Sequence, residues 1–451
     1  MIEKKTKLLE ERHKTSENKF SYANLFWNGL DMSDIRQRAY LAWLTLFLGF
    51  CAMDVEAQAE TELLRDVLSK PIKIERDEVV TSIPLQIRSG MLHLTASIND
   101  FTGEFVFDTG SPTIIDQTIA EKLNLKILGE NTGLDSNGRE VTMRIALAEK
   151  ITLGGTSFYD VPVMVHDYGS VPLGKCYLPN GVIGSELLPG GVWRIDLSNQ
   201  SLKISANAKQ LQFLKGSKKT PLHSFGYPYP PVIDYSIGRF TDKALFDTGN
   251  ASEIALFEPI VSDKWVSNEI DKRTIKVGRG RLGTSAGGIG DIVPLRNFQI
   301  KSLGLGNYEL ENVNAKTRDV PPTLIGRGLL SSHIVTLDYV NADFWVSPML
   351  TADPQAKEDA PGFALSVTDD KLEVSQMFES SRAERAGLLL GDEVVEIDGL
   401  SPPLSTSDQK CQTSRRLSEQ RNLRSIKKIK VYRNGEFKVI VLAEELEVTE
   451  G

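Results

Sequence analysis

Between about residues 74 and 205, the chain alternates apolar and polar residues in short runs that Gly, Asn and Asp interrupt. Such runs occur at residues 83–88, 92–98, 105–107 and 161–165. A period of two bounded by turn-forming residues is typical of β-strands with one buried face. Within this stretch only residues 117–125 have helical spacing. The pattern therefore predicts a mostly β unit.

Residues 218–347 repeat this plan. Three landmarks recur in the same order, displaced by 139, 142 and 142 residues: Asp108 and Asp247, Gly184 and Gly326, Asp196 and Asp338. Asp108 and Asp247 are the first residues of an Asp-Thr-Gly motif, and Gly184 and Gly326 are the last residues of an apolar-apolar-Gly triplet. Asp196 lies in Ile-Asp-Leu and Asp338 in Leu-Asp-Tyr. Chance likeness between generic β-hairpins is the alternative, but a near-constant displacement favours an internal duplication.

A third unit follows a polar, Pro- and Ala-rich stretch. It has alternating strands, a short helical pattern at residues 380–386, and a closing hairpin with an Asn434-Gly435 turn. The expected organisation is an N-terminal extension with a signal peptide (1–59), an N-terminal segment of the mature chain (60–74), two β lobes (75–210 and 211–347), a linker (348–361) and the third unit (362–449).

The N-terminal extension carries an export signal pattern. Arg36 and Arg38 precede an apolar run at residues 39–53, which ends near Ala57-Gln58-Ala59. A basic start, an apolar centre and an A-x-A end are the parts of a secretory signal peptide. The apolar run is shorter than the roughly 20 residues that span a bilayer, although a membrane anchor or a buried helix is the alternative. We expect export to the periplasm or the extracellular space, with cleavage after Ala59 and translation from Met1 or Met32.

Composition narrows the classes of function. The chain is 41% hydrophobic and 25% charged with a net charge of −8, which argues against a nucleic-acid partner because such a partner calls for a basic face. The five histidines are scattered, and the three cysteines, at 51, 176 and 411, have no paired spacing. We therefore expect no metal or other cofactor, and we expect Cys176 and Cys411 to be unpaired thiols in different domains.

The two Asp-Thr-Gly turns carry the candidate chemistry. Each follows an apolar run that predicts a strand: residues 105–107 before Asp108, and residues 244–246 before Asp247. Two close carboxylates share one proton, so that one acts as a base and the other as an acid. Such a pair can activate water against an amide carbonyl without a metal or a covalent nucleophile.

The neighbouring residue types suit this role. Gly110 and Gly249 lack a Cβ, so that the backbone can fold close to a carboxylate. Thr109 and Thr248 can bond across to the opposite turn. Ser111 can donate to an outer carboxylate oxygen, and Asn250 is expected to retain a hydrogen-bond donor at the matching position.

In these motifs the chain resembles the aspartic proteases of the pepsin and retropepsin group over roughly residues 75–347. The resemblance implies two homologous retropepsin-like β-barrel lobes in one mostly β chain, a peptide cleft between them, and Asp108 and Asp247 as the catalytic pair. It also implies flap hairpins, for which the Gly-rich segments around 132–141 and 278–290 are the candidates. Asn250 departs from the Ser, Thr or Ala that is usual there.

The third unit resembles a PDZ domain, which implies a small α+β fold. Residues 383–388 and 391–399 match the family's helix and following strand, and Pro361-Gly362-Phe363-Ala364 lies where the family has its carboxylate-binding loop. A peptide is then expected to pair with residues 363–367, its terminal carboxylate lying against the N–H groups of Gly362, Phe363, Ala364 and Leu365.

Together these features predict an exported aspartic endopeptidase, acting on peptides or unfolded proteins, whose PDZ unit recruits substrate or gates the cleft. Two alternatives remain. The first is a peptide-binding scaffold that has lost catalysis, and the second is a pair of half-sites that act only on dimerisation.

Overall fold

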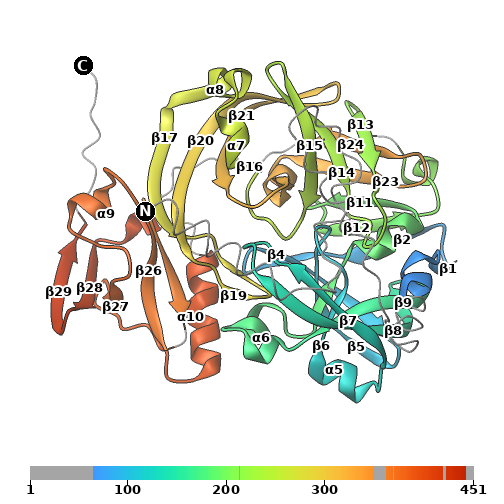
Figure 1. Cartoon of the computed structure of the whole chain (residues 1–451), viewed down its shortest axis with the longest axis horizontal. Helices are drawn as coiled ribbons and strands as arrows, with labels where there is room; N and C mark the ends of the chain where they lie inside the picture. Colours follow the sequence, from blue (N-terminus) through green and yellow to red (C-terminus); the bar gives the residue numbers. More distant parts are fainter. Residues whose placement is uncertain (1–63, 213, 350–361, 369, 420–422, 443–451) are drawn as a thin grey trace, which may run out of the picture.

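The computed structural model describes residues 64–212, 214–349, 362–368, 370–419 and 423–442. The expected signal peptide and nearly all of the expected linker lie outside these residues. The described chain is mostly β, and its two large mixed sheets curl into ring-like structures (Figure 1).

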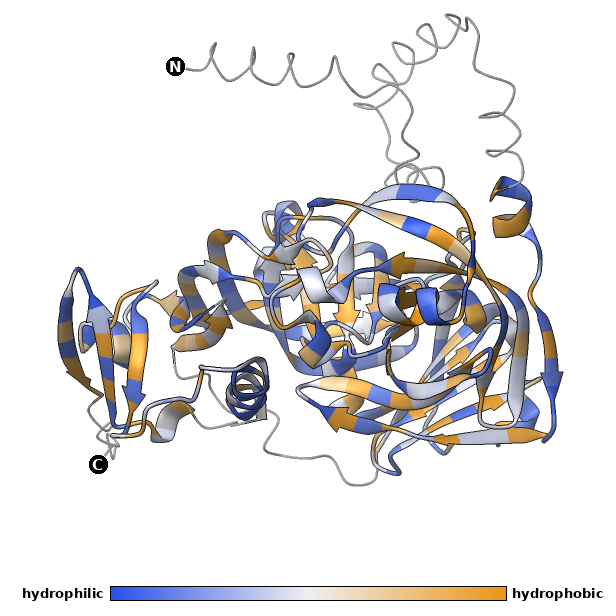
Figure 2. Ribbon diagram, turned by 90° about the horizontal axis from the view of Figure 1, so that it is seen from below, coloured by the Kyte–Doolittle hydropathy of each residue, from blue (hydrophilic) through white to orange (hydrophobic). Residues whose placement is uncertain are grey.

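Lobe one, residues 73–190, holds the first ring. Its strands are β1 (Lys73–Arg76), β3 (Gln86–Arg88), β4 (Met91–Ile98), β5 (Phe101–Phe107), β6 (Ile114–Asp116), β7 (Lys126–Leu134), β8 (Glu140–Leu153), β9 (Thr156–His166) and β10 (Gly181–Ile183). Its α-helices are α5 (Gln117–Lys122) and α6 (Gly174–Tyr177). In β4 every second residue, Leu92, Leu94, Ala96 and Ile98, is apolar and buried. Figure 2 shows orange and blue alternating along many of the strands. The period of two seen in the sequence is thus the alternation between core and surface.

Lobe two, residues 226–331, repeats the arrangement. Its strands are β14 (Val232–Ile237), β15 (Phe240–Asp247), β16 (Ile254–Phe257), β17 (Ile270–Arg281), β18 (Thr284–Ser285), β19 (Gly288–Ile289), β20 (Ile292–Leu305), β21 (Tyr308–Arg318) and β22 (Thr323–Gly326), with helices α7 (Glu258–Val261) and α8 (Lys264–Glu269). In each lobe the strand before the Asp-Thr-Gly turn pairs in parallel with the strand of the apolar-apolar-Gly triplet, β5 with β10 and β15 with β22. The sequence landmarks are therefore structural neighbours.

A third set of strands joins the two lobes, at the right of Figure 1. It comprises β2 (Val80–Pro84), β11 (Val192–Asp196), β12 (Ser201–Ser205), β13 (Lys218–His223), β23 (His333–Asp338) and β24 (Asp343–Pro348). β11 of the first half pairs antiparallel with β23 of the second, Trp193 opposite Leu337. Trp193 is fully buried and stacks on Phe107, which directly precedes Asp108. One hydrophobic core thus runs through both lobes, and it includes Phe107 and Phe246, the residues that precede the two Asp-Thr-Gly turns.

The C-terminal unit, residues 362–442, has a separate core. It contains β25 (Phe363–Thr368), β26 (Lys371–Phe378), β27 (Glu393–Ile397), β28 (Lys428–Arg433), β29 (Glu436–Val441), α9 (Arg382–Arg385) and α10 (Ser407–Glu419). Strand β26 adds to the outer edge of β17, with Gly278 opposite Phe378 and Gly280 opposite Gln376. A Cβ on either glycine would lie within 2.4 Å of a β26 carbonyl oxygen, so only glycine permits this junction.

The prediction of unpaired thiols at Cys176 and Cys411 is wrong. The two residues form a disulfide between α6 of lobe one and α10 of the C-terminal unit, with 5.5 Å between their Cα atoms. They are 235 residues apart, and only the docking of the two units brings them together. No helix among the described residues has the length and apolar character to cross a membrane.

Candidate active site

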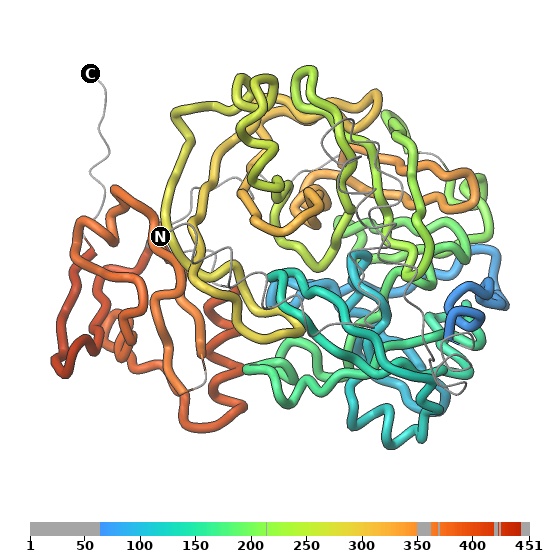
Figure 3. The backbone as a smooth tube through the Cα atoms, in the orientation of Figure 1, coloured from blue at the N-terminus to red at the C-terminus, as the bar shows by residue number. Residues whose placement is uncertain are grey.

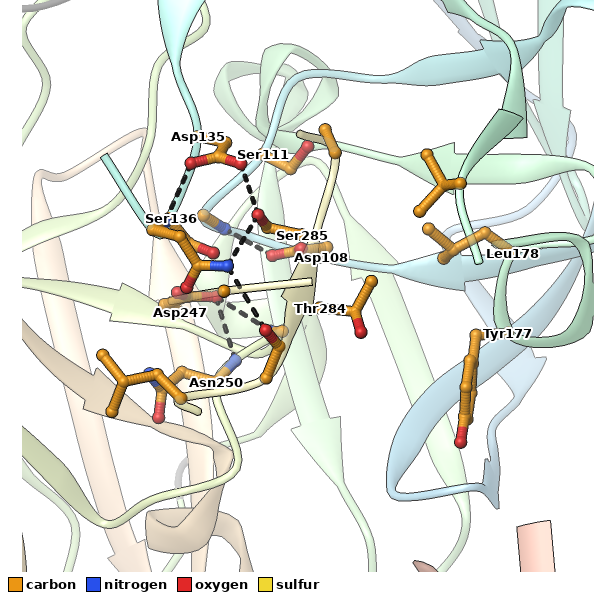
Figure 4. Close-up of a pocket in the computed structure, with 18 of the residues that line it drawn as sticks. Asp108, Ser111, Asp135, Ser136, Tyr177, Leu178, Asp247, Asn250, Thr284 and Ser285 are labelled. Atoms are coloured by element: carbon orange, nitrogen blue, oxygen red, sulfur yellow. Dashed lines mark hydrogen bonds between the residues drawn. The ribbon is translucent and has the colours of Figure 1, made fainter. Parts of the chain in front are cut away.

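The two Asp-Thr-Gly turns meet at the junction of the lobes (Figure 4). Strand β5 ends one residue before Asp108, and β15 ends at Asp247. The preceding Phe107 and Phe246 are fully buried, and the backbone N–H of Asp108 donates to the Ile183 carbonyl at 3.0 Å. Each carboxylate is thus carried on a strand end that the core fixes in place.

Thr109 and Thr248 link the two turns through four hydrogen bonds. The Thr109 N–H donates to Thr248 Oγ1 at 3.0 Å, and the Thr248 N–H donates to Thr109 Oγ1 at 3.1 Å. Each hydroxyl donates in turn to the carbonyl before the opposite aspartate, Phe246 for Thr109 (2.8 Å) and Phe107 for Thr248 (2.9 Å). Both threonines are completely buried. This reciprocal set of bonds holds the turns in register.

Gly110 and Gly249 lie against the carboxylate of the opposite lobe. A Cβ on Gly249 would lie 2.4 Å from Asp108 Oδ2, and one on Gly110 would lie 2.6 Å from Asp247 Cγ. Each glycine N–H also donates at 2.9 Å to the carboxylate of its own turn. Any side chain at either position would push the two carboxylates apart, so the glycines are required for their close approach.

The electrostatics of the pair are asymmetric. Burial raises the pKa of both carboxyl groups, and the charge of Asp247 together with their mutual hydrogen bond raises the pKa of Asp108 further. For Asp247, the same hydrogen bond, the N–H groups of Gly249 and Asn250, and the positive charge of Arg318 oppose the effect of burial. Two carboxyl groups in such close contact share one proton, and the charge of Arg318 favours the ionised form of Asp247 within the pair.

Two of the expected side-chain contacts are wrong. The Ser111 hydroxyl donates to the Pro112 carbonyl at 2.8 Å instead of to a carboxylate. Asn250 donates to Asp247 at 3.2 Å through its backbone N–H, whereas its side-chain oxygen accepts from the Ser252 N–H at 2.9 Å. Because the backbone makes the contact to Asp247, the unusual side chain at position 250 leaves that contact intact.

Two hairpins meet above the carboxylates. One joins β7 to β8 and the other joins β17 to β20, so both lie in the segments expected to form flaps. The Asp135 carboxylate at the first tip accepts hydrogen bonds from Ser285 Oγ and, at 2.9 Å, from the Gly287 N–H at the second tip. Asn137 Nδ2 donates to Ser285 Oγ at 3.0 Å, and Arg139 pairs with Asp291 at 2.6 Å. The hairpins close over a cavity of about 800 Å³ that both catalytic candidates line.

Arg318 and Lys316 line this cavity from the end of β21, and the sequence reasoning missed them. Arg318 is 8% exposed and donates to two carbonyls, Pro322 at 3.1 Å and Ser136 of the first hairpin at 3.4 Å. Burial lowers the pKa of Arg318 to about 10, so it stays charged at neutral pH. Only the pairing of β21 with β16 brings these cations to the site, so no local sequence signal could have found them.

The expected peptide-binding residues of the C-terminal unit lie at the start of β25. Gly362 has a φ of +83° and its carbonyl accepts from the Phe378 N–H at 2.9 Å. Phe363 and Leu365 are 3% and 8% exposed and belong to the core of this unit, and Leu365 also lines the cavity that contains the two carboxylates. Among the described residues, no group of three or more His, Cys, Asp or Glu side chains is placed to hold a metal ion.

A paired-lobe β fold that brings one partly buried aspartate of each lobe together at the junction of the lobes is the arrangement of aspartic-type peptidases. The family model described as aspartyl protease matches residues 94–187, a span that contains Asp108 and the Val182-Ile183-Gly184 triplet. Lobe one thus carries a retropepsin-like aspartyl protease domain, which suggests aspartic-type peptidase activity. No curated protein matches the sequence.

Proposed function

We propose that the protein is an aspartic endopeptidase whose active site is complete within one chain and consists of Asp108 and Asp247. The observation that carries the proposal is the bonding between the two buried threonines, which holds the two carboxyl groups within hydrogen-bonding contact. Lobe two, which the family model does not reach, supplies the second of them.

In this mechanism the ionised Asp247 takes a proton from a water molecule, and the oxygen of that water attacks the carbonyl carbon of the substrate. The protonated Asp108 transfers its proton to the carbonyl oxygen as the tetrahedral diol forms. When the C–N bond breaks, Asp247 gives its proton to the leaving nitrogen, and the diol returns a proton to Asp108. The pair ends in its starting state, and the hairpins keep bulk water away from it.

A peptide-binding scaffold without catalysis is the second candidate. It shares the cavity but requires no proton between the carboxylates, and the asymmetric pair disfavours it. Half-sites that act only on dimerisation are unnecessary, because both halves are present in one chain.

The chain from Glu60 onward is assayed on a peptide library from pH 3 to pH 8, beside D108N and D247N. We expect cleavage by the wild type and a loss of at least a thousandfold in each variant. Asp319→Asn is the matched control, because Asp319 lines the same cavity but is exposed, and it should keep its activity. A wild type that binds peptides yet cleaves none at any pH would establish the scaffold instead.

We further propose export and a PDZ-type role for the C-terminal unit, with the division of the chain expected from the sequence. The Cys176–Cys411 disulfide supports export, because such bonds persist in oxidising compartments. A mature N-terminus upstream of residue 50 would reject cleavage after Ala59. Deletion of residues 362–451 tests recruitment: cleavage of proteins should fall, whereas cleavage of short peptides should not.

A further inference from the structure

The cavity that holds the catalytic candidates extends beyond the two lobes. At its far end it is lined by residues of the C-terminal unit: Leu365, Ser366 and Val367 of β25, and Ser414, Leu417 and Ser418 of α10. Helix α10 packs beside β25, so these residues form the two walls of one groove. The groove and the active site are therefore parts of the same cavity.

A loop of lobe one connects the two ends. Leu173, Tyr177 and Leu178 line the cavity between the carboxylates and the groove. Leu173 also packs against the core of the C-terminal unit. Figure 4 shows Tyr177 and Leu178 at the opposite side of the pocket from Asp247 and Asn250. The passage is thus apolar along the lobe-one side.

The C-terminal unit is fixed to the lobes at two places. At one, β26 extends the sheet of lobe two through β17. At the other, the Cys176–Cys411 disulfide is flanked by a hydrogen bond between Tyr177 and Ser414 and by one from Arg415 to the Cys176 carbonyl at 3.0 Å. Figure 3 shows α10 lying against the loop that carries α6. A unit held in this way keeps one orientation towards the cleft, unlike a module on a flexible tether.

We propose that the groove between β25 and α10 forms the distal subsites of the substrate cleft. This inference rests on the proposed peptidase function. The occupant is the substrate polypeptide itself: the segment whose scissile bond lies at Asp108 and Asp247 continues past Tyr177 and Leu178. An apolar side chain of that segment enters the groove against Leu365 and Leu417. The preferred substrates are then extended polypeptides with an apolar residue well away from the cleaved bond.

The test compares a short peptide, confined to the residues around the scissile bond, with a long peptide that carries leucine at the distal positions. Leu417→Asp should lower kcat/KM for the long peptide by about tenfold or more, the loss expected when a buried leucine contact is replaced by a charge. Cleavage of the short peptide should be unchanged. Leu400→Asp is the matched control, because Leu400 is 77% exposed on the same unit and does not line the cavity.

Pairing the Leu417→Asp variant with a positively charged peptide distinguishes a lost contact with the substrate from damage to the fold. With Leu417→Asp, a long peptide carrying lysine at the distal positions should be cleaved better than the leucine peptide, a reversal of the wild-type preference. Cys411→Ser, or reduction of the wild type, should lower cleavage of the long peptide only. If the Leu417→Asp variant has the wild-type kcat/KM for every peptide, the inference fails and the peptidase proposal stands. If the wild type cleaves neither peptide, the proposed function itself fails.

Discussion

The threonine bonds between the lobes give the sharpest test of the site. Replacing Thr248 with valine keeps the shape of the side chain but removes its hydroxyl. That hydroxyl accepts from the Thr109 N–H and donates to the Phe107 carbonyl, and all of these atoms lie in the buried junction. Thr248→Val therefore leaves the Thr109 N–H and the Phe107 carbonyl without their hydrogen bond to position 248.

The cost follows from these two groups. A buried polar group that loses its partner costs about 1–3 kcal/mol, so the free energy of unfolding should fall by about 4 kcal/mol. Urea denaturation followed by tryptophan fluorescence measures this change. Activity should fall as well, because the same bonds hold Asp108 and Asp247 in position.

Two further variants make the test specific. Thr248→Ser restores the hydroxyl and should recover most of the stability and the activity. Thr156→Val removes the buried hydroxyl pair of Thr81 and Thr156, at 2.8 Å and away from the carboxylates, and should cost about 1 kcal/mol with full activity. A Thr248→Val protein within about 0.5 kcal/mol of the wild type would refute the reasoning, since surface substitutions produce changes of that size.

Three other variants test the hairpins, the ionised carboxylate and the C-terminal unit. Asp135→Ala removes the contacts between the hairpin tips and should raise KM several-fold, whereas Asp291→Ala breaks only an exposed pair and should change KM little; steady-state kinetics on one peptide compares them. Arg318→Met removes a positive charge that lowers the pKa of Asp247. The pKa of Asp247 should therefore rise, and the acidic limb of the kcat/KM profile should move to higher pH. Arg433→Leu leaves the buried Asp392 carboxylate without its ion pair and should destabilise the C-terminal unit by about 3–5 kcal/mol. Hydrogen exchange in the lobes should change only at β17, which pairs with β26, because the cores are separate.

The mostly β fold could be predicted because it rests on local patterns. Strand β4 shows the period of two directly, and the recurrence of the Asp-Thr-Gly and apolar-apolar-Gly motifs indicated that the chain is built twice. Each of these signals is contained in a few consecutive residues.

What the sequence did not reveal depends on contacts between distant segments. Gly278 and Gly280 were interpreted as part of a flexible flap, yet they belong to β17 and admit β26 at its edge. The same docking of the C-terminal unit creates the disulfide between Cys176 and Cys411. Neither follows from composition or spacing, because each depends on which surfaces of separately folded units meet.

The duplication also raises the question of how two equal turns come to hold different charges. In lobe one, β6 pairs with β9 so that Asp116 lies opposite His166; in lobe two, the matching pair is Phe257 and Arg318. His166 and Arg318 therefore occupy equivalent positions, and each bonds to the backbone of the opposite hairpin tip, at Ala286 and Ser136 respectively.

These equivalent residues differ in charge. Burial lowers the pKa of His166, so this residue is neutral near pH 7 and lends Asp108 no positive charge. Arg318 is charged at the same pH and favours ionised Asp247. An identical pair of lobes would leave the proton on either aspartate with equal preference. The positive charge of Arg318, which lobe one lacks at the matching position, therefore favours Asp247 as the base of the proposed reaction.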